Sequence, residues 1–147
     1  MKKIIYITLL LATVLFAGCK KYKVEFEGQL VEFKPVSLTL TRGTATTAAT
    51  ANIVVQLVGA QQTSDLVIPF TVDAANTTAV AGTNYTLSST GTITIPANSS
   101  TGKITITSNF ANNTTAKKLT LVLADGGPVT VSQNYKTCTV TLSTTTP

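Results

Sequence analysis

The side chains that can carry acid–base, nucleophilic or metal chemistry are few in this sequence. It contains no histidine, and beyond residue 32 its only carboxylates are Asp65, Asp73 and Asp125. A serine or cysteine nucleophile therefore has no imidazole base, and histidine-ligated zinc or iron is excluded. A glycosidase needs two carboxylates held roughly 5–10 Å apart, but nothing in the sequence places Asp73 and Asp125 in a shared cleft. Asp is a favoured turn residue, so we expect solvated turn carboxylates and a protein that is not an enzyme.

The two cysteines have different expected roles. Cys138 falls on the apolar side of an alternating run, where a small buried residue is expected rather than a reactive thiol. Cys19 follows a leader over 1–18 with a positive start at Lys2 and Lys3, an apolar run and small residues at its end. That run is shorter than the ~20 residues that a permanent membrane-spanning helix needs.

The residues Phe16-Ala17-Gly18-Cys19 resemble a bacterial lipobox, with Phe16 where that motif usually has Leu. The resemblance implies cleavage before Cys19 and acylation of its thiol and new N-terminus, palmitate included; an ordinary signal peptide is the alternative. Two or more acyl chains give stable membrane anchoring. We predict a bacterial lipoprotein of the cell envelope, with residues 19–29 as lipidated Cys and tether. The outer membrane is expected and its leaflet is left open.

The charge of the chain argues against nucleic acid as a partner. The 147 residues carry a formal charge of +5, but two of the positive residues lie in the leader and several more in the tether. From Gly43 onward the lysines and aspartates nearly balance. A nucleic-acid-binding domain normally presents a basic face.

Beyond the tether, apolar residues alternate with polar ones at a period of two, which is typical of strands with one buried face. The chain is also rich in threonine, which favours strands. Phe33 and Phe70 fit the core pattern, while Pro69 indicates an edge or a bulge. No window predicts an amphipathic helix. We therefore predict an all-β, immunoglobulin-like β-sandwich of about seven antiparallel strands over 30–147. Its expected inward residues are Val36, Leu38 and Leu40; Ile53, Val55 and Leu57; Leu66, Ile68, Phe70 and Val72; Ile93 and Ile95; Ile104 and Ile106; Leu119, Leu121 and Leu123; and Cys138, Val140 and Leu142.

The order of these segments resembles the Calx-beta domain, an immunoglobulin-like sandwich found in exchangers, integrin tails and bacterial surface proteins. The stretch from Thr78 to Tyr85 matches its pattern Thr-Ala-x-x-Gly-x-Asp-Tyr, and Gly91–Pro96 matches its Gly-x-hydrophobic-x-hydrophobic strand. Apart from the family, Gly82 can take a positive φ in a tight turn. Tyr85 is then expected to bury its ring, which is a structural role.

In calcium-binding members of that family, acidic residues cluster at one end of the sandwich. Here the corresponding positions are neutral or basic, and Asp73 is the only carboxylate expected near that end. Calcium requires six to eight oxygen ligands, usually including several carboxylates. We therefore expect no calcium, no other metal and no cofactor. The substituted positions are Arg42, Asn84, Ser108–Phe110, Asn112–Thr115 and Ser143.

Two functions compete once enzymes are set aside. The first is a structural, adhesive or protein-interaction module, whose exposed strand edges can pair with an envelope protein. Its expected surface is the edge containing Pro69 or the loops Ala74–Asn84 and Ser108–Ala116. The second is a glycan-binding accessory lipoprotein of a surface polysaccharide uptake system. It requires an exposed Phe110 or Tyr135 beside polar side chains.

Overall fold

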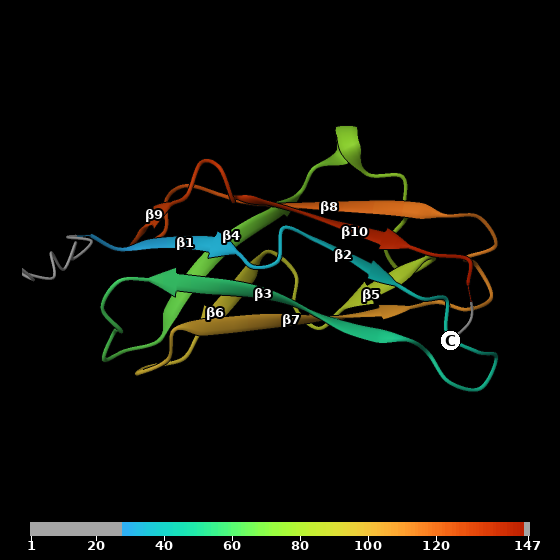
Figure 1. Cartoon of the computed structure of the whole chain (residues 1–147), viewed down its shortest axis with the longest axis horizontal. Helices are drawn as coiled ribbons and strands as arrows, with labels where there is room; N and C mark the ends of the chain where they lie inside the picture. The colour runs from blue at the N-terminus through green and yellow to red at the C-terminus, as the bar shows by residue number, and fades with distance from the viewer. Residues whose placement is uncertain (1–27, 146–147) are drawn as a thin grey trace, which may run out of the picture.

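The computed structural model describes residues 28–145, so the leader, Cys19 and most of the tether lie outside the described residues. The domain is a sandwich of two five-stranded sheets (Figure 1). The first sheet has the order β5-β7-β3-β1-β9 and the second the order β2-β10-β8-β4-β6. The predicted all-β, immunoglobulin-like sandwich is thus confirmed. The strands are β1 (Leu30–Phe33), β2 (Ser37–Leu40), β3 (Thr50–Val58), β4 (Leu66–Val72), β5 (Tyr85–Leu87), β6 (Thr92–Ile95), β7 (Thr101–Ser108), β8 (Lys117–Leu123), β9 (Thr130–Val131) and β10 (Thr137–Leu142), and η1 (Ala74–Asn76) is a single turn of 3₁₀-helix.

The strand count and pairing differ from the prediction in two ways. The described chain has ten strands, because β5 and β9 are only three and two residues long and β1 and β2 belong to different sheets. Two of the pairings, β1 with β9 and β2 with β10, are parallel. Strands this short carry too little alternation for a period of two to identify them.

The core follows the predicted alternation along almost every strand. The inward residues of β3, β6, β7, β8 and β10 are buried, and so are Phe33 and Phe70. Val36 and Val72 are exceptions, 40% and 41% exposed, and Leu38 is half-buried. Val36 lies where the chain crosses from one sheet to the other, between β1 and β2, so no facing strand covers it.

Pro69 is not on an edge strand, so the edge alternative of that prediction is wrong. Instead β4 changes partner at this residue: Leu66–Pro69 pair with β6, and Phe70–Val72 pair with β8. Because proline has no N–H to give to a ladder, it is tolerated where one pairing ends. Its carbonyl accepts a hydrogen bond from the Ala124 N–H at 2.9 Å.

Strand β3 defines the two ends of the domain. Val58, at its end, pairs with Leu30, where the tether enters, and Thr50, at its start, pairs with Thr107. At about 3.3 Å per residue, the nine residues of β3 separate these ends by about 26 Å. Figure 1 shows β1 beginning near one end of the sandwich and β10 running toward the other. Over residues 28–145, no helix has the length and apolarity needed to cross a membrane.

Candidate functional site

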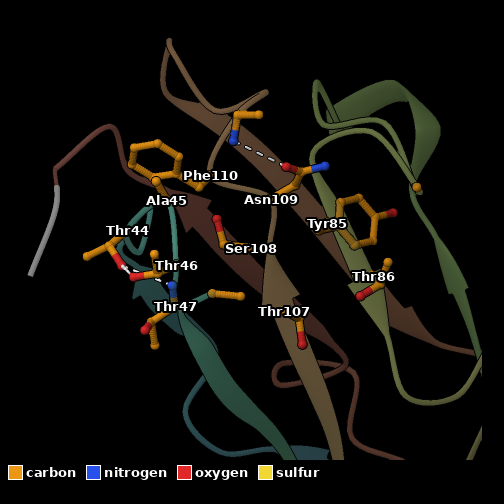
Figure 2. Close-up of a pocket in the computed structure, with 13 residues that line it drawn as sticks. Thr44, Ala45, Thr46, Thr47, Tyr85, Thr86, Thr107, Ser108, Asn109 and Phe110 are labelled. Atoms are coloured by element: carbon orange, nitrogen blue, oxygen red, sulfur yellow. Dashed lines mark hydrogen bonds between the residues drawn. The ribbon is translucent and has the colours of Figure 1, made fainter.

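The end of the sandwich away from the tether, here called the loop end, carries a hollow of about 610 Å³. This volume lies within the range usual for ligand pockets. Figure 2 shows threonines of the segment before β3 on one side and Tyr85 and Thr86 of β5 on the other, with β7 between them. Seven of the thirteen lining residues carry a hydroxyl group, Tyr85 included, and Phe110 brings a second aromatic ring, but most of the exposed lining surface is apolar. The lining residues are Thr44–Ala48, Gly82, Tyr85, Thr86 and Thr107–Ala111.

Arg42 contacts Phe110, one of the two aromatic residues that line this hollow. The Arg42 Nε donates a hydrogen bond to the Phe110 carbonyl at 2.6 Å. The guanidinium carbon lies 4.1 Å from the centre of the Phe110 ring, which is a cation–π contact. Phe110 is half-buried. One residue thus binds both the backbone and the ring of the segment that forms the hollow.

Buried amides tie together the loops behind Phe110, in what we call the amide network (Asn84, Ser108, Asn112 and Asn113). Asn84 Oδ1 accepts from the Val80 N–H at 2.8 Å, and its Nδ2 donates to the Asn112 carbonyl at 3.1 Å. Asn113 Nδ2 donates to the Asn84 carbonyl and to Ser108 Oγ, both at 2.8 Å. Asn84, Ser108 and Asn113 are all buried.

The positions at which the Calx-beta resemblance leads one to expect acidic calcium ligands are therefore occupied by groups that hydrogen-bond to one another, although Asn113 Oδ1 is buried without a hydrogen-bond partner among the described residues. Amide N–H groups donate where an ion would attract oxygen atoms, and Arg42 brings a positive charge to the same end. Between residues 28 and 145, no three side chains of His, Cys, Asp or Glu gather closely enough to hold a metal ion. Calcium independence itself stays a prediction.

The three aspartates lie in three different loops: Asp65 before β4, Asp73 after β4 and Asp125 after β8. Asp73 caps η1 by accepting from the Ala75 and Asn76 N–H groups and from Asn76 Nδ2. The hydrogen bond from the Asn76 side chain is the main cause of a lowered pKa at Asp73. Asp65 accepts from the Ala97 N–H at 2.9 Å, and Asp125 follows β8. Asp73 thus stabilises its own turn, whereas Asp65 joins the segment before β4 to the segment after β6.

A second hollow, of about 500 Å³, lies on the other side of β5, and we call it the open corner. Strand β5 is the outermost strand of its sheet, and the Phe70–Val72 half of β4 has β8 on one side but has lost β6 on the other. Val72 has the same parity as Leu66, Ile68 and Phe70, all buried, yet it is 41% exposed. The two sheets are therefore not closed over each other here. The lining is largely apolar: Phe70–Val72, Ala81, Gly82, Tyr85–Leu87, Thr90 and Gly91.

Tyr85 separates the two hollows and is buried, as predicted. Gly82 has φ +74, and its N–H donates to the Tyr85 carbonyl at 2.8 Å, so the predicted tight turn is present. Burial raises the pKa of the Tyr85 phenol. Its ring lines both hollows from a fixed position.

Cys138 is also buried, as predicted. Its Sγ is 3.6 Å from the Pro35 carbonyl, and burial raises the pKa of the thiol to about 11. A protonated, covered thiol is not a nucleophile at neutral pH.

Phe110 and Tyr135, the two candidate ligand-contacting rings, do not share a site. Tyr135 is 50% exposed and lines a separate hollow with Glu32–Val36, where its carbonyl accepts from the Phe33 N–H. Only Phe110 lies among several hydroxyl groups. Sequence reasoning did not anticipate Thr44, Thr46 and Thr47 beside it. Their position in the sequence, two to five residues after Arg42, could have indicated that they lie at the same end of the domain.

The fold resembles several solved structures at low sequence identity. A candidate carbohydrate-binding protein from Bacteroides ovatus has a TM-score of 0.58 and 11% identity over 78% of this chain, which spans 36% of that protein. The Calx CBD1 domain in its apo form has a TM-score of 0.59 and 14% identity, with 81% of this chain and 99% of the domain covered. The calcium binding domain CBD12 of CALX1.1 has a TM-score of 0.56 and 13% identity over 79% of this chain and 44% of its own.

No protein-family model matches the sequence, and no curated protein matches it. At these identities the structural neighbours establish a Calx-beta-like fold and nothing finer. The predicted resemblance is thus confirmed at the level of the fold.

Proposed function

We propose that this protein is a non-enzymatic binding domain that a lipid on Cys19 holds at the bacterial cell envelope, expected at the outer membrane. Its role is structural, adhesive or one of protein interaction. The separated aspartates and the covered Cys138 support a role without catalysis. The tether enters at one end of β3, so the loop end lies about 26 Å farther along the domain. A domain anchored in this way presents its loops and edges to partners away from the lipid.

One observation carries the interaction role: Val72 is exposed although its strand parity directs it inward. Next to it, β5 is the outermost strand of its sheet; the Gly82 N–H binds the Tyr85 carbonyl, and the edge beyond Tyr85 has no neighbouring strand in the described chain. Exposed backbone beside an apolar surface is what an added strand of a partner uses, with main-chain hydrogen bonds for affinity and pockets for alternate side chains. The surface differs from the one expected from sequence, since Pro69 itself is not at an edge.

Two valines of β4 provide a matched test of this surface. Val72 points into the open corner, whereas Val67 is 48% exposed on the outer face of the same strand. The domain carrying Val72→Lys is expected to lose its envelope partners in a chemical cross-linking experiment, while Val67→Lys keeps them. Equal partner recovery with both variants would contradict the role of the corner.

Lipid anchoring has its own test. Cells expressing the full chain are expected to incorporate radiolabelled palmitate into the wild-type protein and not into Cys19→Ser. Label that persists in Cys19→Ser would overturn the anchoring at this residue.

Glycan binding is the second candidate, and the position of Phe110 supports it. Its ring lines a hollow whose other walls carry the hydroxyls of Thr44, Thr46, Thr47 and Thr86. Sugars are bound by rings that pack on their C–H faces and by polar side chains that meet their hydroxyls. On a glycan array, Phe110→Ala is expected to abolish saturable binding, and Tyr135→Ala in its separate hollow is expected to leave it unchanged. Loss on Tyr135→Ala alone would move the site to the other hollow, and the absence of any glycan signal would refute this candidate.

A further inference from the structure

Arg42 brings a positive charge to the loop end without a carboxylate beside it in the described part of the chain. Asp73 caps η1, and the positive charge of Lys118 contributes to the lowered pKa of its carboxyl group. Asp65 accepts a hydrogen bond from the Ala97 N–H. Asp125 follows β8, and Glu32 lies on β1 opposite Gln56, toward the tether. The Arg42 side chain is only half-buried, and its hydrogen bond to Phe110 engages Nε alone.

Arg42 does not itself line the hollow, but its guanidinium contacts Phe110, which does. The remaining guanidinium nitrogens therefore have donors for a ligand that extends from the hollow past Phe110. Arginine presents these donors in a planar fork that matches the two oxygens of a carboxylate or sulfate. The ring contact with Phe110 fixes the plane of the guanidinium, so less side-chain freedom is lost when an anion binds. Threonine hydroxyls of the same hollow begin two residues later, at Thr44.

We propose that the loop-end hollow binds an acidic saccharide, whose carboxylate or sulfate accepts hydrogen bonds from Arg42 while its ring packs beside Phe110. The threonine side chains meet the sugar hydroxyls. This inference rests on the glycan-binding candidate, and it adds the chemical class of the sugar and the residue that selects it. A neutral sugar can use the hydroxyls and the ring but offers no acid group to the Arg42 guanidinium.

The first experiment separates this proposal from the function on which it rests. The domain is applied to an array that holds uronic-acid, sialic-acid, sulfated and neutral glycans. Binding concentrated among the acidic glycans supports the proposal, and the carboxylated and sulfated arms identify which acid is read. Binding concentrated among neutral glycans keeps the glycan function and overturns the acid selectivity. No binding at all refutes both.

The second experiment assigns the selectivity to Arg42. Affinity is measured by calorimetry for the best carboxylated or sulfated oligosaccharide and for the same sugar with its acid group reduced or removed. Arg42→Gln is expected to weaken binding of the acidic sugar about tenfold and to leave the neutral analogue within about twofold. Arg42→Lys keeps the charge without the fork, so it should recover only part of that loss. A purely structural effect on Phe110 would lower both affinities together, and that result would overturn the assignment.

Two controls exclude a general effect of charge. Lys103→Gln removes one positive charge from an exposed position on β7 and is expected to leave both affinities unchanged. A polyglutamate peptide offers carboxylates without sugar rings and should bind far more weakly than the acidic oligosaccharide. If the peptide binds equally well, the hollow recognises charge alone and the saccharide proposal fails.

Discussion

The loop end and the open corner lie on opposite sides of β5 and share Tyr85. They differ in how far their exposed groups find partners within the domain. At the loop end, polar groups bind one another: Asn84 and Asn113 join the loop before β5 to the loop after β7, and Arg42 joins a third segment to Phe110. At the open corner, an apolar wall and the edge of β5 beyond Tyr85 have no neighbouring strand in the described chain. Most polar groups of the first region bind one another, but Asn113 Oδ1 is buried without a hydrogen-bond partner among the described residues, and the Arg42 charge remains for a ligand. The second region leaves apolar side chains, Val72 among them, exposed to solvent.

The largest expected effect compares two inward positions on β4. Ile68 is 1% exposed and Val72 is 41% exposed. Ile68→Ala is expected to lower the free energy of unfolding by about 2–5 kcal/mol, since it leaves a cavity in a closed core. Val72→Ala should cost less than about 1 kcal/mol, because the side chain is already in contact with water. Urea unfolding of the isolated domain measures both. Equal losses would mean that the corner is closed in solution, and the comparison would fail.

The next prediction concerns how much the amide network contributes to the free energy of unfolding. Asn113 is fully buried and its Nδ2 makes two hydrogen bonds. Asn113→Ala should lower the free energy of unfolding by about 2–3 kcal/mol, because buried partners lose their donor. Asn112→Ala is the control: its Nδ2 donates to the Thr83 carbonyl from an exposed position, and we expect less than about 1 kcal/mol. Similar losses in the two variants would show that burial of the amide is unimportant.

A smaller effect concerns Tyr85, which both regions share. Its pKa is raised by burial, so the folded state holds the phenol proton more tightly than the unfolded state. That contribution to stability is complete below pH 10, the ordinary value of tyrosine, and is lost as the pH rises through the folded-state value. Tyr85→Phe should therefore change stability by less than about 1 kcal/mol at pH 7 and remove part of the alkaline loss. Unfolding curves at pH 7 and above pH 10 test this, and identical alkaline losses in the two proteins would contradict it.

The sequence predicts the closed parts of this fold better than the open ones. Ile53, Ile104 and Leu121 each lie in a long strand in which apolar residues recur at every second position. All three are buried, since a facing sheet covers that side of the strand. Val72 obeys the same pattern and is exposed, because the pattern records which way a side chain points and not whether a strand faces it. The neighbour that β4 lacks at this point is a property of the topology, and no local window contains it.

The candidate site shows the same division. The loss of acidic residues at Arg42, Asn84 and Ser108 could be read from the sequence, and it correctly indicated a changed loop end. The network that replaces them could not, because Asn84 and Asn113 are 29 positions apart and meet only after β5 pairs with β7. The glycan-binding alternative required Phe110 or Tyr135 to be exposed beside polar groups, and Phe110 is half-buried. Its contact with Arg42, 68 positions away, depends on the same folding.

The last prediction has an expected effect of zero and tests the loop end most directly. Calcium at millimolar concentration should leave the melting temperature of the domain where a chelator leaves it. The amide nitrogens of Asn84 and Asn113 already bind the oxygens that an ion would need, and Arg42 would repel a cation. A ligand present at 100 times its Kd stabilises a protein by about 2.7 kcal/mol, which raises the melting temperature of a domain this size by several degrees. A shift of that size would show that oxygen atoms of the loop end, with the unpartnered Asn113 Oδ1 as a candidate, bind the ion in solution, and calcium independence would have to be abandoned.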